Sequence, residues 1–108
     1  FSAFHPSWKM TDRPPTPPST LTRARRIARE EGLRHVYTGN VHDRDGQSTF
    51  CHACGTRLIG RDWYVLDEWN LDHQGRCAKC HATCAGVFES KPGAWGSQRL
   101  PVRLADFA

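Results

Sequence analysis

Apolar residues recur at helical spacing in one segment of the chain, STLTRARRIAREEGL, which covers residues 19–33. The apolar positions are three or four residues apart: Leu21, Ala24, Ile27 and Ala28. This spacing predicts an α-helix with one apolar face and an arginine-rich outer face. We expect Ser19 or Thr20 to cap the start of this helix and Gly32 to end it.

Short apolar runs lie on both sides of this helix. Phe1–Phe4 precedes it and Leu33–Val41 (LRHVYTGNV) follows it, and each run predicts a short strand. MTDRPPTPPS, residues 10–19, holds four prolines and predicts an extended connection. Strand, helix, strand is the order of a parallel βαβ unit, which needs neighbouring strands and cover on both faces. We therefore expect residues 1–44 to be an incomplete piece of a larger sheet.

The pattern changes to short alternating segments in the second half of the chain. RLIGR and DWYVLDEW are separated by turn-forming residues and predict antiparallel strands. The fold class expected is therefore small α+β: an incomplete βαβ piece followed by an antiparallel β module over residues 45–88. Residues 89–108 show no period and are expected to be a flexible tail. Four apolar side chains of the tail remain available to dock elsewhere: Leu100, Val102, Leu104 and Phe107.

Length and composition add two constraints. The chain has 108 residues and a mass of 12.2 kDa. Units of about 50 residues bury too little surface to be stable without an additional cross-link. No apolar run is long enough to span a membrane, and the first residues lack the profile of a signal peptide. We expect a soluble, cytoplasmic polypeptide that is part of a longer protein.

The net charge of +4 is unevenly distributed. Residues 1–40 carry seven Lys/Arg against three Asp/Glu, and residues 41–88 carry five against six. The net charge of −1 on the second segment argues against a phosphate partner for the β module itself.

Two CxxC pairs predict such a cross-link: Cys51 with Cys54 and Cys77 with Cys80, separated by 22 residues. Four thiolates suit a tetrahedral zinc ion at about 2.3 Å, and a hairpin of this length can bring the pairs together. Gly55 follows the first pair, where the turn commonly needs a positive φ. The pattern predicts one structural Zn²⁺, with iron in a rubredoxin-like site as an alternative because the same ligands suit both metals.

The remaining candidate groups receive structural interpretations. Cys84 is interpreted as a small buried side chain in a strand, CAGVF. His52 and His81 are expected to face solvent or to lie beside the ligands, since four cysteines already close the site. Some of the module's aromatic residues are expected in the core: Trp63, Tyr64, Trp69 and Phe88.

No catalytic residue is predicted. Four other groups could work as acids or bases: His5, His42, Asp43 and Asp45. No nucleophile-and-base pattern or paired-carboxylate spacing connects them, so we expect them in surface or turn positions. HDRDG is typical of a polar turn before the β module.

Three linked stretches carry a resemblance to a known family: FHPSWKMTDRPPTPPSTL, then GLRHVYTGNVHDRDGQSTFCHACGTRLIGRD, then GRCAKCHATCAGVF. Residues 1–88 resemble the C-terminal part of radical S-adenosylmethionine proteins of the AmmeMemoRadiSam system, often labelled as relatives of pyruvate formate-lyase activating enzyme. The resemblance implies the end of a partial (β/α) barrel followed by a zinc ribbon. It also implies a parent with a 4Fe–4S cluster and S-adenosylmethionine, in which FHP and GNVHD would line the mouth of the barrel.

The chain departs from that family in its cysteine pattern and in lacking the strands that would bind the cosubstrate. The cluster-binding CxxxCxxC is absent, and Cys77, Cys80 and Cys84 are spaced in the reverse order. We therefore expect neither cluster nor radical chemistry in this chain alone, which would act as a structural zinc-binding module with a surface for recognising a substrate or partner. The partners expected are the rest of the barrel and a protein substrate, with no membrane or nucleic acid, and the chain is expected to be a monomer. A nucleic-acid-binding zinc ribbon and a rubredoxin-like electron carrier remain the alternatives.

Overall fold

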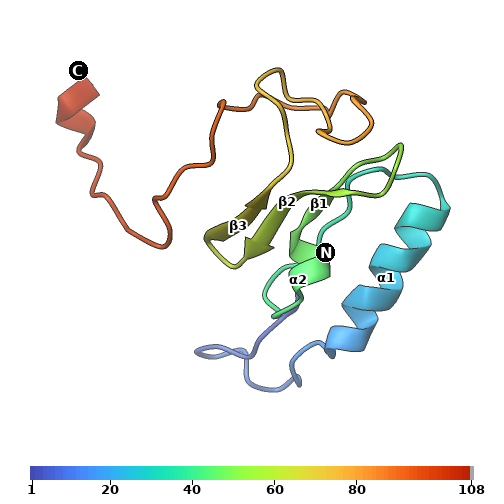
Figure 1. Cartoon of the computed structure of the whole chain (residues 1–108). Coiled ribbons are helices and arrows are strands. Elements are labelled where there is room, and N and C mark those ends of the chain that lie inside the picture. The colour runs from blue at the N-terminus through green and yellow to red at the C-terminus, as the bar shows by residue number, and fades with distance from the viewer. Residues whose placement is uncertain (108) are drawn as a thin grey trace.

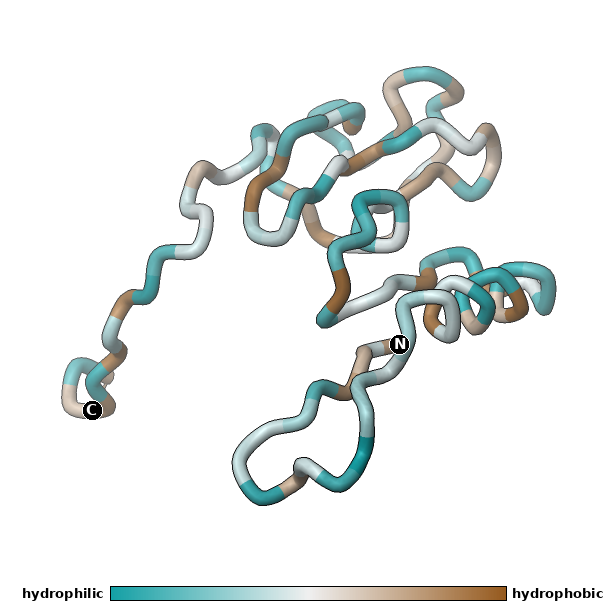
Figure 2. The backbone as a smooth tube through the Cα atoms, turned by 90° about the horizontal axis from the view of Figure 1, so that it is seen from below, coloured by the Kyte–Doolittle hydropathy of each residue, from teal (hydrophilic) through white to brown (hydrophobic). Residues whose placement is uncertain are grey.

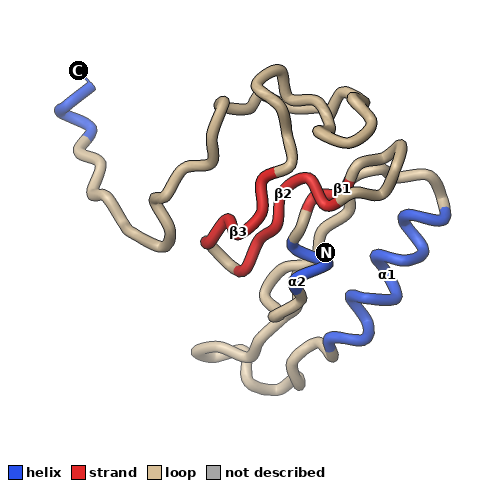
Figure 3. Tube along the Cα trace, in the orientation of Figure 1, coloured by secondary structure: helices blue, strands red, loops and turns tan. Residues whose placement is uncertain are grey.

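The computed structural model describes residues 1–107, and its centre is a three-stranded antiparallel sheet (Figure 1). The strand order is β1 (Thr49–Phe50), β2 (Arg57–Asp62) and β3 (Val65–Trp69). The β2–β3 hairpin pairs Ile59 with Trp69 and Asp62 with Val65. Strands and helices together cover a minority of the chain, as Figure 3 shows. The molecule is thus small α+β, with the antiparallel module that the alternating pattern predicts.

Helix α1 (Pro18–Glu30) begins earlier than predicted. The residue before its first turn is Pro17, and no side chain caps it, so the prediction of Ser19 or Thr20 as the cap is wrong. Proline at the first helical position already has helical φ and has no N–H that needs a partner. The end of α1 agrees with the sequence: Gly32 has φ 95°, and the Leu33 amide donates to the Ala28 carbonyl at 3.1 Å.

The predicted parallel strand pair is reduced to a single bridge. Ser2 and Gly39 pair in parallel across α1, and the Gly39 amide donates to the Phe1 carbonyl at 2.8 Å. The strands predicted at Phe1–Phe4 and Leu33–Val41 are otherwise absent from residues 1–107. A parallel pair needs further strands to extend its ladder, and the described part of the chain supplies none beside it. A complete βαβ unit is therefore not present, although the parallel sense of the contact is.

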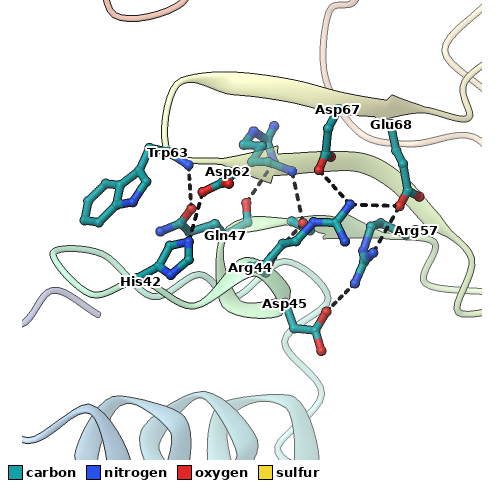
Figure 4. Close-up of polar contacts among 11 residues, drawn as sticks. His42, Arg44, Asp45, Gln47, Arg57, Asp62, Trp63, Asp67 and Glu68 are labelled. Atoms are coloured by element: carbon teal, nitrogen blue, oxygen red, sulfur yellow. Dashed lines mark hydrogen bonds and ion pairs between the residues drawn. The ribbon is translucent and has the colours of Figure 1, made fainter.

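Helix α2 (Arg44–Gln47) replaces the predicted polar turn with one helical turn attached to the hairpin. The Asp43 carboxylate caps it by accepting from the Gly46 amide at 2.9 Å. Arg44 reaches Asp67 at 2.6 Å and Glu68 at 3.2 Å (Figure 4).

A second arginine completes this network. Arg57 lies between Glu68, at 3.1 Å, and the Asp45 carboxylate (Figure 4). The Glu68 hydrogen bond, with Asp45 as a further partner, raises the pKa of Arg57. A single exposed ion pair contributes little to stability. Here Arg44 and Arg57 share the Glu68 carboxylate, so the pairs form a network. It fixes α2 on the surface of the sheet.

The main core lies between the hairpin and the loops that follow it. Its buried members are Cys51, Leu58, Ile59, Leu71, Cys77 and Cys84. Trp69 packs against this group with its ring edge-on to Phe88, the ring centroids being 6.4 Å apart. The sequence prediction that some aromatics are core therefore holds for these two, whereas Trp63 and Tyr64 are exposed at the hairpin turn.

The C-terminal segment leads away from this body (Figures 1 and 2). It ends in a short 3-10 turn, η1 (Leu104–Phe107), and Leu104 is 89% exposed. The radius of gyration of the Cα trace is 17.0 Å, against about 13 Å for a compact chain of this size. Among residues 1–107 no helix has the length and apolar character needed to cross a bilayer.

Candidate metal centre

The four cysteines of the two CxxC pairs meet in space. Their sulfur atoms all lie within 4.8 Å of one another. Across the pairs, Cys51 Sγ is 3.5 Å from Cys80 Sγ, and Cys54 Sγ is 3.7 Å from Cys77 Sγ. No disulfide joins any of them. The two CxxC pairs, whose facing cysteines are 23 and 29 positions apart, therefore form one cluster of thiols.

The size of this cluster suits a tetrahedral ion. Four sulfurs at about 2.3 Å from a central metal lie about 3.8 Å from one another. The observed cross-pair distances of 3.5 and 3.7 Å are close to that edge. Cys51 and Cys77 are buried and Cys54 and Cys80 are exposed, so one side of the cluster faces the core and the other faces water. The arrangement is a zinc-ribbon-like module that can hold a metal ion such as zinc.

Backbone hydrogen bonds shape the two cysteine turns in the same way. In the first turn the Cys51 amide donates to the Thr56 carbonyl at 2.8 Å, and the Gly55 amide donates to the Cys51 carbonyl at 3.0 Å. The second turn repeats both bonds 26 residues later. There the Cys77 amide donates to the Ala82 carbonyl at 2.9 Å, and the His81 amide donates to the Cys77 carbonyl at 2.8 Å. The two halves of the centre are therefore local copies of one turn.

Asp72 prepares the second turn and was not among the residues that the sequence singled out. Its carboxylate accepts from the Gln74 amide at 2.8 Å, from the Arg76 amide at 3.0 Å and from Arg76 Nε at 2.9 Å. The Arg76 amide, with these other donors, lowers the pKa of Asp72 to about 2. The signal in the sequence was the Asp-x-x-Gly turn, DHQG, which ends two residues before Cys77.

The thiols perturb one another strongly. Hydrogen bonds from the side chain and backbone of Thr56 lower the pKa of Cys54 to about 6. The Ala82 amide lowers the pKa of Cys80, but its cysteine neighbours, Cys54 above all, outweigh that effect and raise the pKa to about 12. Negative charge on one sulfur thus opposes negative charge on the next. A cation at the centre of the cluster would remove that opposition, because it lets all four sulfurs be thiolates.

Cys84 lies outside this cluster. It is 4% exposed in the core, and its amide donates to the Gly75 carbonyl at 3.0 Å. Burial, followed by the nearby Cys51, raises its pKa, as expected of an inert thiol. The strand predicted at CAGVF is wrong, since residues 84–88 form none, but the buried position of Cys84 agrees with the sequence. His52 and His81 are exposed and do not belong to the sulfur cluster.

The four other candidate acid–base groups take separate positions. Asp43 caps α2, and Asp45 pairs with Arg57. His42 Nε2 lies 3.0 Å from Asp62 Oδ1, and its ring stacks on Trp63 (Figure 4). His5 Nε2 lies 2.7 Å from the Asn40 carbonyl.

Comparison with curated proteins finds a similarity over most of the chain. The chain is 49% identical over 81 residues to MJ0808, an uncharacterised protein of Methanocaldococcus jannaschii. The matched part is 74% of this chain and 24% of that protein, so the chain spans about a quarter of the length of the curated relative it matches. No family model matches the chain, and no solved structure matches it.

Proposed function

We propose that this chain is a zinc-binding module of a radical S-adenosylmethionine protein, in which one structural Zn²⁺ folds the ribbon beside the end of the catalytic barrel. The observation that carries the first half of the proposal is the four-sulfur cluster, whose edges fit a tetrahedral ion. The ligands would be Cys51, Cys54, Cys77 and Cys80. The second half rests on the resemblance of residues 1–88 and on three further features, two of the fold and one of the comparison.

The first feature is the parallel contact between Ser2 and Gly39 on either side of α1. It supports an origin in an α/β sheet, because parallel pairs are joined by such crossover helices. The second is the incomplete cover of α1, where Ile27 is 42% exposed although it lies on the apolar face. The third is the length of the similar protein MJ0808, most of which lies outside the matched part.

Zinc in this role would supply no catalysis. Apparent binding energies for zinc in small thiolate domains are about 10–16 kcal/mol, comparable to the whole stability of a domain. The main core includes the ligands Cys51 and Cys77, so the metal and the apolar core would form together. The module would thereby place α2 and the hairpin, with the His42–Asp62 pair, at a fixed position beside the barrel.

Two purified proteins test the proposal. This chain should contain about one zinc and no visible absorption, whereas full-length MJ0808, reconstituted anaerobically with iron and sulfide, should also show the absorption of a 4Fe–4S cluster. Absence of that cluster from MJ0808 would remove the radical half of the proposal. A red chain containing iron and no zinc would instead support the second candidate, a rubredoxin-like electron carrier, which the same four sulfurs favour.

A further inference from the structure

A groove of about 300 Å³ lies between the C-terminal half of α1, the segment that follows it, and the first cysteine turn. Its walls come from parts of the chain that are distant in sequence: Arg25 and Arg29 from the helix, Arg34 and His35 from the following segment, and His52 from the cysteine turn. Figure 1 shows the end of α1 reaching the same side of the molecule as the loop after β1. The fold therefore gathers basic side chains from the helix, the following segment and the first cysteine turn.

The positive charge of this groove is not neutralised within the described residues. No Asp or Glu lines it. Neither Arg29 nor Arg34 forms an ion pair with any carboxylate of residues 1–107, although Arg26, next to the groove, pairs with Glu30 at 2.9 Å. Arginines four apart on one helix face repel each other, which makes Arg25 and Arg29 unfavourable neighbours without an anion.

Arg25 is held in place as a positive charge. Its Nε donates to the Val36 carbonyl at 3.0 Å and its Nη2 donates to the Asp45 carbonyl at 3.3 Å, and both acceptors are neutral backbone groups. Its guanidinium lies 5.9 Å from the centre of the Phe50 ring. These contacts fix the side chain without cancelling its charge, so the wall of the groove is organised before any ligand arrives.

The groove also offers an aromatic surface. Tyr37 lines it with 39% of its surface exposed, and Phe50 lines it from β1. A guanidinium group can donate two parallel hydrogen bonds to two oxygens of a phosphate. An aromatic ring beside it can stack on a planar group. The volume is at the lower end of that of small-molecule sites. The net charge of −1 on residues 41–88 does not oppose phosphate binding in the groove, because the arginines that line it come from residues 1–40.

We propose that this groove binds a phosphate-bearing small molecule of about nucleotide size, with Arg29 and Arg34 as the groups that contact the phosphate. Arg25 orients the basic side of the groove, and the exposed ring of Tyr37 contacts the planar part of the ligand. Cys51, His52 and Gly55 belong to the same groove, so its shape depends on the first cysteine turn. The groove borders the sulfur cluster through Cys51, and ligand binding there requires no radical chemistry.

The test uses the whole zinc-loaded chain and three probes: inorganic phosphate, pyrophosphate and AMP. Titration followed by amide NMR should give saturable shifts confined to residues 25–37 and 50–55, with AMP tighter than phosphate. The double variant Arg29→Gln/Arg34→Gln should weaken AMP binding by about tenfold or more, the loss expected when charge-assisted hydrogen bonds are removed. The matched control Arg23→Gln/Arg26→Gln removes the same charge from α1 outside the groove and should change it by less than about twofold.

Zinc content and amide dispersion establish that each variant is folded, and Arg34→Gln alone, which lies outside α1, provides a second variant. The proposal is overturned if no probe saturates, if the control weakens binding as much as the groove variant, or if the shifts spread over the whole surface. Tighter binding of oligothymidylate than of AMP, lost equally in both double variants, would also overturn it. That result would assign the basic face to nucleic acid.

Discussion

Gly55 and His81 occupy the same position in the two cysteine turns: each follows the second cysteine of its pair and has a left-handed backbone, with φ 74° and φ 61°. Each donates its amide to the carbonyl of the first cysteine of its pair. Glycine adopts this conformation without strain. For a residue with a Cβ, the left-handed conformation costs about 1–2 kcal/mol of folding free energy. The second turn thus has histidine where the first has glycine.

Replacement His81→Gly should leave one metal bound and raise the free energy of unfolding by about 1 kcal/mol, because it removes the left-handed strain. The converse variant, Gly55→Ala, should lower the free energy of unfolding by about 1 kcal/mol. Backbone strain is the whole cause, because no atom lies within 4 Å of the added Cβ and no clash contributes. Denaturant unfolding of the metal-bound proteins measures both. If His81→Gly lowered the metal stoichiometry, the imidazole would be a ligand, contrary to the assignment.

Replacement Asp72→Asn should weaken the second turn, because the neutral amide accepts less strongly from Gln74, Arg76 and its guanidinium. The pKa of Asp72 is lowered to about 2 in the folded protein, from 3.8, so its contribution is fully present above pH 3.8 and lost as the pH falls toward 2. The difference in melting temperature between wild type and variant should therefore be constant from pH 8 to pH 5. A difference that shrinks across that range would contradict the depressed pKa.

Replacement Gly46→Ala should destabilise the attachment of α2. The added Cβ would overlap the Asp43 carboxylate and Thr38 Oγ1, which bond each other at 3.0 Å. Overpacking of this kind costs about 1–3 kcal/mol. Gly93→Ala is the control, because nothing lies within 4 Å of its added Cβ and a change of less than about 0.5 kcal/mol is expected there. Equal unfolding midpoints for the two variants would show that α2 does not contribute to the stability of the fold.

The sequence predicted the antiparallel module well because its signals are local. Alternation in RLIGR and DWYVLDEW and the CxxC turns each depend on neighbours along the chain, as does the Gly32 helix stop outside the module. The strands at Phe1–Phe4 and Leu33–Val41 could not be predicted in the same way, since a strand also depends on what pairs with it. The DHQG turn is a local signal for Asp72, but the amides that its carboxylate accepts from are known only from the folded structure.

The chain alone should not cleave S-adenosylmethionine, even after anaerobic reconstitution with iron and sulfide. Reductive cleavage needs three cysteine ligands and one open iron, whereas the four sulfurs of the two turns have the spacing that suits a closed tetrahedral site. Cys84 is the only other cysteine, and it lies buried in the core. Formation of 5′-deoxyadenosine above a no-protein control, lost in Cys84→Ala, would make the chain an enzyme.

Metal stoichiometry in two matched cysteine variants shows which thiols hold the metal. Native mass spectrometry should find one zinc in the wild-type chain and in Cys84→Ser, because that thiol lies outside the sulfur cluster. Cys80→Ser should lose the metal or bind it far more weakly, and its amide signals over residues 50–88 should collapse, because binding and folding are coupled. If Cys80→Ser retained zinc while Cys84→Ser lost it, the assignment of the metal centre would be wrong.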